Sequence, residues 1–289
     1  MSDSSRRKPR PSSNPVSERL VAELPPALEH VPAILARLDL RPAVFLDFDG
    51  TLAPIVSRPE DACLPAESRE QLRRLAEHVP VGILSGRELA DVRRRVGLET
   101  LQYAGSHGFE FAAADGVCHD HPEATAYLPL LDAAEQELRR CLAPLQGVII
   151  ERKRFSLAVH VRLAGSEETA AAARAVVQVL DRHRGLRCTR GRKVYDLQPG
   201  IDWHKGRALL RMLAQINAGG GSPRRALYIG DDVTDEDAFR ILAGRGVAVV
   251  VRDGLLHTTA EYVLGDPREV CLFLATFNHL LAQAGNRMR

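Results

Sequence analysis

The stretch Ala43-Val-Phe-Leu-Asp-Phe-Asp-Gly-Thr-Leu52 joins a short apolar run to two aspartates, Asp47 and Asp49, that are one residue apart. The run predicts a β-strand, and Gly50 with Thr51 predicts the turn that ends it. Residues i and i+2 of a strand point the same way, so the two carboxylates face one spot and repel unless a cation lies between them. The alternative interpretation is an ordinary turn, since Asp and Gly are common turn formers. The spacing favours the ligand-binding edge of an α/β sheet.

Other apolar runs alternate with helical patterns before and after this stretch. Strands are predicted at residues 79–84, 101–104, 226–229, 247–251 and 262–264. Helical periodicity predicts short helices within residues 17–40 and further helices at 65–78, 88–96, 205–216 and 270–281. This alternation is typical of the α/β class, with a Rossmann-like parallel sheet covered by helices on both faces.

Residues 111–199 follow a different order. Helices are predicted at 123–145 and from Ser166 to about Gly185, and strands at 147–150, 155–163, 186–189 and 193–197. The resulting αββαββ unit lies between segments of the larger domain, so we expect an α+β cap inserted into a core formed by residues 18–110 and 200–289. Hinges are expected near residues 109–116 and 199–202, because the site must admit substrate and then exclude water.

Composition excludes several classes of protein. The chain has 289 residues, and 39 Lys and Arg against 37 Asp and Glu give a net charge of +2, so neither nucleic acid nor a membrane is expected as a partner. No stretch approaches the roughly 20 apolar residues of a membrane span. Residues 1–17 predict a disordered basic tail without an apolar signal region, which favours a cytoplasmic location. Five widely spaced cysteines suggest free thiols in a reducing compartment.

Polar residues follow several of the predicted core strands at the same relative place. Ser85 follows the second strand, Lys205 stands at a helix start, and three carboxylates come after the strand at 226–229, namely Asp231, Asp232 and Asp235. The carboxyl ends of parallel strands meet at one edge of a sheet, so these groups can converge with Asp47 and Asp49. Taken singly, each has a plain interpretation as a turn, surface or helix-start residue. Together they predict a site for a phosphoryl group and a hard divalent cation, for which Mg²⁺ is the favoured candidate.

In this order, Asp-Phe-Asp-Gly-Thr-Leu52, Ser85, Lys205 and Gly230-Asp-Asp resemble the four motifs of the haloacid dehalogenase-like (HAD) phosphatase superfamily, over residues 41–270. The αββαββ insert resembles the cap of its sugar phosphatases. The stretches 47–55, 85–87, 105–110 and 230–236, with cap segments 151–162 and 191–197, are similar to the trehalose-6-phosphate phosphatase family.

The resemblance implies that Asp47 attacks phosphorus and becomes an aspartyl-phosphate, and that Asp49 protonates the leaving oxygen and then activates water. It implies that Mg²⁺ binds the Asp47 side chain, the Asp49 backbone carbonyl and Asp231, with Asp232 and Asp235 behind them or joined through water. Ser85 and Lys205 would bind the phosphoryl oxygens.

The resemblance assigns substrate binding to residues at the cleft and on the cap, namely Arg87, His107, Glu151, Lys153, His160, Arg162, Lys193 and Asp196. The family usually has Glu where this chain has Asp196. Alternation in residues 155–162 separates Phe155, Leu157, Val159 and Val161 from a polar face with Ser156, His160 and Arg162. Glu151 and Lys153 join that polar face only if the chain turns before Phe155. A solvated strand face is the alternative for each cap residue, and His107 is assigned a structural hydrogen bond rather than base catalysis.

The implied reaction is hydrolysis of trehalose 6-phosphate to trehalose and phosphate. Three alternatives stay open: another sugar-phosphate phosphatase, a phosphomutase, and a catalytically silent module that binds sugar phosphate. A trehalose-6-phosphate synthase also stays open as a protein partner.

Overall fold

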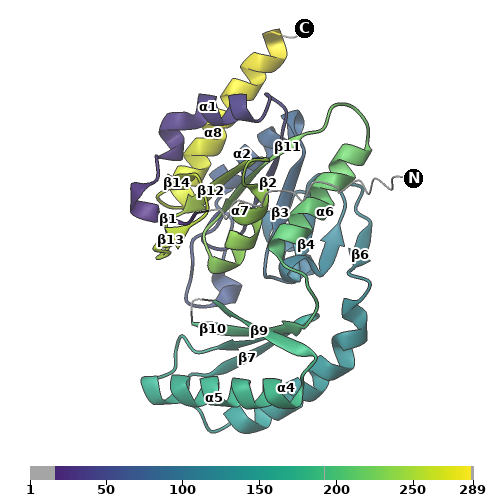
Figure 1. The fold of residues 1–289 in the computed structure, drawn as a ribbon, viewed down its shortest axis with the longest axis vertical. Helices are drawn as coiled ribbons and strands as arrows, with labels where there is room; N and C mark the ends of the chain where they lie inside the picture. Colours follow the sequence, from purple (N-terminus) through teal and green to yellow (C-terminus); the bar gives the residue numbers. More distant parts are fainter. Residues whose placement is uncertain (1–16, 192, 288–289) are drawn as a thin grey trace, which may run out of the picture.

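The computed structural model describes residues 17–191 and 193–287. The predicted basic tail therefore lies, apart from Ser17, outside the described residues. Figure 1 shows a large sheet with helices on both faces and, below it, a smaller sheet whose helices lie on the side away from the large one. This arrangement confirms the predicted α/β fold with an inserted cap.

The large sheet has the order β14-β12-β11-β2-β3-β4-β5-β6 within the described chain. Its parallel strands are β2 (Pro42–Leu46), β3 (Val81–Leu84), β4 (Gln102–Gly105), β11 (Arg225–Gly230), β12 (Val247–Val251) and β14 (Tyr262–Leu264). Strand β2 pairs with both β11 and β3. The chain runs outward from β2 in one direction through β3 and in the other through β11 and β12. The carboxyl ends of β2 and β11 therefore flank the switch point at which open α/β sheets bind ligands.

Two hydrophobic cores, one on each face, explain why β2 is an unbroken apolar run. Val44 and Leu46 belong to the core under α1 (Val31–Arg37), α2 (Ala66–His78), α3 (Leu89–Val96) and α8 (Pro267–Arg287). Ala43 and Phe45 belong to the core under α6 (Lys205–Ala218) and α7 (Glu236–Leu242). A strand that is buried on both faces needs apolar side chains at every position, so its rigid end can hold charged groups in place.

The cap sheet is antiparallel, with the order β7-β8-β10-β9. Its strands are β7 (Ile149–Lys153), β8 (Ser156–His160), β9 (Leu186–Gly191) and β10 (Val194–Pro199), and its helices are α4 (Leu128–Leu142) and α5 (Ser166–Arg182). Leu157 and Val159 of β8 pack in the core shared with these helices. The alternate residues Ala158 and His160 line the cleft that faces the large sheet. The predicted period-2 pattern thus separates a packing face from a face that lines the cleft.

The structure differs from the sequence prediction where the chain enters the cap. Strands β5 (Glu110–Ala112) and β6 (Cys118–Asp120) continue the large sheet as antiparallel edge strands. Three-residue strands are too short for periodicity to reveal. Residues 111–120, assigned to the cap from the sequence, thus pair with the core sheet, and the chain crosses at residues 121–127. The remaining boundaries and the hinges stay predictions.

Three smaller features complete the fold. Helix α5 begins at Ser166, and Gly165 is its N-cap. Strand β1 (Arg19–Leu20) pairs with β13 (His257–Thr258). Single 3₁₀ turns occupy Val21–Glu23, Ala27–His30, Pro59–Asp61, Ser106–Gly108, Ala124–Tyr127 and Val233–Asp235. None of the helices in the described ranges is long and apolar enough to cross a bilayer.

Candidate active site

A cleft of about 940 Å³ separates the carboxyl edge of the large sheet from the open face of the cap sheet. The cleft brings together most of the residues that the sequence singled out. From the core these are Asp47, Asp49, Arg87, His107, Lys205, Asp231 and Asp232, and from the cap Glu151, Lys153, His160, Arg162, Lys193 and Asp196. The convergence predicted from strand order is therefore present, while the role of each residue stays a prediction.

Asp47 is held at the end of β2 by continuation of the sheet. Its backbone N–H donates to the Ile229 carbonyl at 2.9 Å, and its residue is 5% exposed. The chain then turns through Gly50, whose φ of +85° disfavours any side chain. A Cβ on Gly50 would also lie 2.1 Å from Oδ2 of Asp231. The Asp-Gly sequence is thus required for Asp47 and Asp231 to share one space.

Lys205 joins two of the buried carboxylates. At the first position of α6, its Nζ donates to Asp47 Oδ1 and Asp235 Oδ1, each at 2.7 Å. Asp235 also accepts from the Tyr228 hydroxyl and, through Oδ2, from the backbone N–H groups of Asp231 and Asp232 at 3.0 Å. Asp235 therefore fixes Lys205 and the loop after β11 in one orientation.

Burial makes this cluster electrostatically demanding. Desolvation raises the pKa of Asp47 to about 7, although the charge of Lys205 opposes the shift. Desolvation followed by the charges of Asp47 and Asp235 raises the pKa of Asp231 well above its usual value. Burial lowers the pKa of Lys205, but the two neighbouring carboxylates outweigh it and raise the pKa. One lysine is therefore not enough to keep all the carboxylates ionised.

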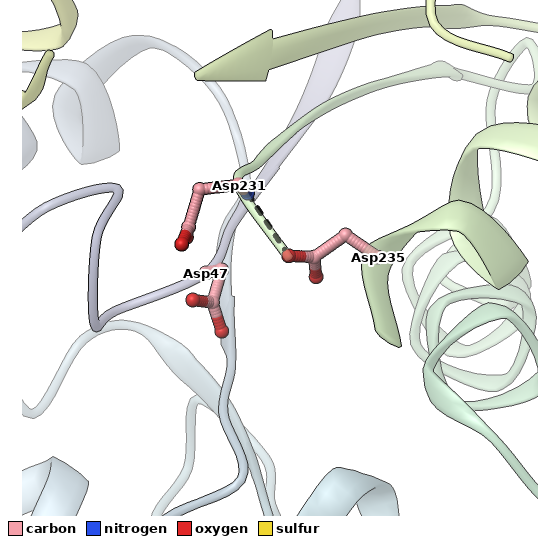
Figure 2. A group of neighbouring side chains, drawn as sticks. All are labelled: Asp47, Asp231 and Asp235. Atoms are coloured by element: carbon pink, nitrogen blue, oxygen red, sulfur yellow. Dashed lines mark hydrogen bonds between the residues drawn. The ribbon is translucent and has the colours of Figure 1, made fainter. Parts of the chain in front are cut away.

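A divalent cation would supply the missing charge. The carboxylate atoms of Asp47, Asp231 and Asp235 lie within 4.8 Å of one another. Figure 2 shows Asp47 and Asp231 directed toward the same space, while Asp235 receives the Asp231 amide. Thr51 donates to Asp231 Oδ1 at 2.8 Å and orients that carboxylate. Oxygen-rich, buried and acidic, the cluster fits a hard divalent metal.

The cluster includes Asp235, which the resemblance placed behind the metal ligands together with Asp232. Asp235 lies in it, whereas Asp232 Oδ1 accepts from the Val233 amide at 2.7 Å as the cap of the following 3₁₀ turn. Burial raises the pKa of Asp232 as well. Because Asp235 already accepts from a lysine, a tyrosine and two amides, its geometry suits holding the other groups in position more than metal ligation. Metal roles of Asp47, Asp49, Asp231 and Asp232 remain predictions.

Asp49 is held by Arg87. The guanidinium donates from Nε to Asp49 Oδ2 and from Nη2 to Asp49 Oδ1, both at 2.7 Å. The Arg87 side chain is 11% exposed, bonds Asp91 at 2.9 Å and lies over the Phe48 ring. Bidentate pairing of this kind is strong and directional. Arg87, assigned to substrate from the sequence, thus orients the acid that neighbours Asp47.

Ser85 is placed behind the cleft surface. Its residue is 1% exposed and is not among the described residues that line the cleft. Its hydroxyl accepts from the Arg87 amide at 3.1 Å, which fixes the loop after β3. Its predicted contact with a phosphoryl oxygen remains a prediction.

The cap side of the cleft presents carboxylates that already have partners. Glu151 on β7 and His160 on β8 are joined at 2.8 Å, because the chain turns at Arg154 and Phe155 between these strands. This turn meets the condition that the sequence set for Glu151 and Lys153. The hydrogen bond from His160 lowers the pKa of Glu151.

Asp196 on β10 joins the cap to the core. Oδ2 is 3.2 Å from His107 Nε2 and accepts from Gln198 at 2.6 Å. Burial raises the pKa of Asp196, but the His107 hydrogen bond and the Lys153 charge outweigh it and lower the pKa below its usual range. Oδ1 is buried and without a hydrogen bond among the described residues. A carboxylate oxygen in this state suits a sugar hydroxyl.

Other cap residues bridge to the core. Lys153 donates to the Gly86 carbonyl at 3.1 Å, and Arg162 donates to the Val56 carbonyl at 2.9 Å. Lys193 lies exposed between β9 and β10 with a φ of +63°. The bridges by Lys153 and Arg162 keep basic groups at the cleft, where they can meet an anionic substrate.

Sequence reasoning missed three supporting residues: Thr51, Tyr228 and Gln198. Thr51 lies within the Asp47–Leu52 motif, so its hydroxyl could have been identified from the sequence. Gln198 lies two residues after Asp196 on the same strand, so the rule that residues i and i+2 point the same way could have identified it. The contact of Tyr228 with Asp235 depends on how the loop after β11 folds back, so only the folded arrangement reveals it.

Comparisons with known proteins agree with this geometry. Residues 45–266 match the family model for trehalose-phosphatase. The trehalose-phosphate phosphatase of Mycobacterium tuberculosis strain H37Rv is 43% identical over 270 residues, which cover 92% of this chain and 69% of that protein. The relative from Mycobacterium marinum is 42% identical over 271 residues, covering 93% and 69%.

Solved structures show the same fold. The C-terminal domain of trehalose-6-phosphate phosphatase from C. albicans superposes with a TM-score of 0.77 at 21% identity, covering 89% of this chain and 98% of that one. A haloacid dehalogenase-like hydrolase from Bacteroides thetaiotaomicron gives 0.60 at 14% identity, covering 83% and 99%. The sequence matches show that the chain belongs to the trehalose-phosphatase family, and the solved structures show that it shares its fold with a haloacid dehalogenase-like hydrolase.

Proposed function

We propose that this chain hydrolyses trehalose 6-phosphate to trehalose and inorganic phosphate through an aspartyl-phosphate on Asp47. The observation that carries this proposal is the position of Asp47, buried between Lys205 and Asp231 at the switch point of the sheet and facing the polar side chains of the cap across one cleft. Family membership supports both the reaction and the substrate.

In the first step, a carboxylate oxygen of Asp47 attacks phosphorus and the bond between phosphorus and the sugar oxygen breaks. Protonated Asp49 gives its proton to that oxygen, so trehalose leaves as an alcohol. Arg87 holds both oxygens of Asp49 in this structure. Asp49 must therefore exchange this pairing for the leaving group during the cycle.

In the second step, Asp49 accepts a proton from water as the water oxygen attacks phosphorus. The bond between phosphorus and Asp47 breaks, and phosphate leaves while Asp47 regains its carboxylate. Lys205 stays in contact with Asp47 throughout and stabilises its ionised form. The buried position of this pair strengthens that interaction relative to water.

A Mg²⁺ ion held by Asp47 and Asp231 would neutralise charge on the phosphoryl oxygens. The residues of the chain supply the rest: Lys205 and Asp235 keep Asp47 aligned, and the proposed Ser85 and Lys205 contacts orient the phosphoryl group. The carboxylates of Glu151 and Asp196 would accept hydrogen bonds from sugar hydroxyls, and Arg162 and Lys193 would complete the cap side.

A panel of phosphate esters tests the proposal. With Mg²⁺ present, trehalose 6-phosphate should give phosphate with a larger kcat/KM than glucose 6-phosphate, sucrose 6-phosphate or mannosyl-3-phosphoglycerate. EDTA should abolish release and Mg²⁺ should restore it. Equal turnover across the panel would reject the narrow substrate and keep a sugar-phosphate phosphatase. If the substrate carries an isotopically labelled phosphoryl group, movement of that group to a second position on the sugar would instead indicate a phosphomutase. Binding without turnover would indicate a silent module.

A trehalose-6-phosphate synthase is a proposed partner, because it would supply the proposed substrate, and a cytoplasmic location is proposed with it. Co-purification of the synthase with a tagged full-length chain tests the first, and cell fractionation tests the second.

A further inference from the structure

The turn that carries His107 adopts an unfavourable backbone conformation. Ser106 and His107 have φ values of +48° and +56°, and Gly108 follows with +94°. Residues with a side chain rarely occupy this left-handed region, and two in succession are rarer still. Such a conformation persists only where the surrounding structure holds it, so the contacts of this turn indicate what it serves.

A buried carboxylate outside the cleft holds the turn. Glu110 is 7% exposed, and its Oε2 accepts from the Ser106 hydroxyl at 2.7 Å and from the Leu89 amide at 3.3 Å. The backbone adds two bonds to the preceding loop, from Ser106 N–H to the Arg87 carbonyl at 2.6 Å and from His107 N–H to the Ser85 carbonyl at 2.9 Å. Glu110 therefore ties the turn to the start of α3.

The turn aims His107 across the domain boundary. The imidazole packs over Gly86, where an added Cβ would lie 2.8 Å from its Cε1. Its Nε2 is 3.2 Å from Oδ2 of Asp196 on the cap strand β10. Asp196 keeps Oδ1 free of any hydrogen bond among the described residues. A continuous chain of contacts thus runs from Glu110 through Ser106 and His107 to the sugar side of the cleft.

We propose that Glu110 is a positioning residue for sugar recognition: through Ser106 it holds the His107 turn so that His107 orients Asp196. This inference rests on the proposed function, because it assigns Asp196 to the sugar. Glu110 is not among the described residues that line the cleft, so it acts through the other two and does not touch the reacting atoms.

Four proteins separate positioning from general stability: the wild-type chain and the variants Glu110→Gln, Glu110→Ala and Ser106→Ala. Both hydrogen bonds end on one oxygen of Glu110, so the amide oxygen of Gln can accept both. Ser106→Ala removes the link to the turn and leaves the Leu89 bond intact.

Each protein is assayed with Mg²⁺ on trehalose 6-phosphate and on p-nitrophenyl phosphate, which has no sugar. Glu110→Ala should raise KM for trehalose 6-phosphate about 10-fold, with kcat changed less than about 3-fold. Ser106→Ala should show a similar but smaller effect, and Glu110→Gln should stay within about 2-fold of wild type. Turnover of p-nitrophenyl phosphate should stay within about 2-fold throughout.

A parallel fall with both substrates would overturn the proposal in favour of a structural role. The proposal would also be overturned if Glu110→Gln raised KM for trehalose 6-phosphate as much as Glu110→Ala does, or if Glu110→Ala left that KM unchanged. The side-chain NMR signals of His107, assigned with a His107→Asn variant, give a readout independent of substrate. These signals should shift in Glu110→Ala and Ser106→Ala, and they should keep their wild-type positions in Glu110→Gln. If wild type cleaves only p-nitrophenyl phosphate, the proposed function fails, and these signals still decide the positioning role.

Discussion

The core side and the cap side of the cleft, called here the core wall and the cap wall, shift the pKa values of their carboxylates in opposite directions. On the core wall, burial raises the pKa of Asp47 to about 7 and also raises that of Asp231. On the cap wall, hydrogen bonding from His160 lowers the pKa of Glu151. Burial raises the pKa of Asp196, but the His107 hydrogen bond and the Lys153 charge together outweigh it and lower that pKa. The core wall has too little positive charge for its carboxylates, whereas each of the two cap carboxylates already has a histidine partner.

This difference suits the core wall to phosphoryl chemistry and the cap wall to sugar binding. A buried cluster that needs a cation is suited to stabilising charge on a phosphoryl group, because it is preorganised and shielded from water. Paired carboxylates on an antiparallel sheet can accept sugar hydroxyls without a metal and without a change of protonation. Variants on the core wall should therefore stop the chemistry, and variants on the cap wall should weaken sugar binding.

The largest expected effect comes from Asp47→Asn. The amide cannot attack phosphorus, so kcat should fall by about 10⁴-fold or more on both trehalose 6-phosphate and p-nitrophenyl phosphate. Lys205 keeps its bond to Asp235, so the fold should persist. Phosphate release and circular dichroism measure the two quantities. Residual activity above one per cent of wild type would remove Asp47 from the role of nucleophile.

Magnesium should stabilise the fold more at higher pH. The pKa of Asp47 is raised from 3.8 to about 7 in the folded, metal-free protein. The folded state therefore binds a proton that the unfolded state has lost, and the contribution of Asp47 to stability is present below about pH 4 and is lost as pH rises toward 7. Mg²⁺ must displace this proton, so it binds more tightly as pH rises.

The measurement is the gain in unfolding free energy on adding a fixed Mg²⁺ concentration at pH 5, 6 and 7, from denaturant titration. Taking the difference at each pH cancels the titration of groups remote from the metal. The gain should grow by about 1 kcal/mol per pH unit. A gain that is constant with pH, or one that persists unchanged in Asp47→Asn, would contradict the metal role of the cluster.

A smaller and selective effect is expected on the cap wall. Glu151→Gln weakens the pairing with His160 and removes an ionised acceptor. KM for trehalose 6-phosphate should rise about 10-fold, while kinetics on p-nitrophenyl phosphate stay near wild type. Steady-state kinetics on both substrates measure this. Equal losses on the two substrates would show that the cap wall also supports the chemistry.

The smallest effect is expected at the rim between core and cap. Arg154 is half exposed and pairs with Asp120 at 2.6 Å. Exposed ion pairs contribute little because water and salt screen them. For Arg154→Ala, kcat and KM should remain within about 2-fold of wild type. A large change in kcat or KM of this variant would indicate that the rim contributes to closing the cap over the core.

Much of the core site could be predicted because it follows from local pattern and strand order. A short apolar run followed by Asp47 and Asp49, and a second strand followed by Asp231, place acids at one sheet edge once the strands are parallel. The partners could not be predicted in the same way. Arg87 is a surface-type residue in sequence, and its bond to Asp49 depends on how the loop after β3 folds over Phe48.

The cap was less determined by its sequence. Alternation separated the packing and binding faces of β8, but the side of the cleft on which Glu151 lies depended on the turn at Arg154 and Phe155. The edge strands β5 and β6 were missed because three residues carry too little periodicity. Both depend on pairing between segments, which propensity does not contain.

By itself, the sequence determined the α/β class, the inserted αββαββ cap and the set of acids, because periodicity and motif spacing are local properties of the chain. Only the tertiary structure decided which acids lie together in the buried cluster, which one Arg87 holds, and how Glu110 reaches Asp196 through Ser106 and His107. These depend on distances between residues far apart in sequence, and desolvation then sets their charge.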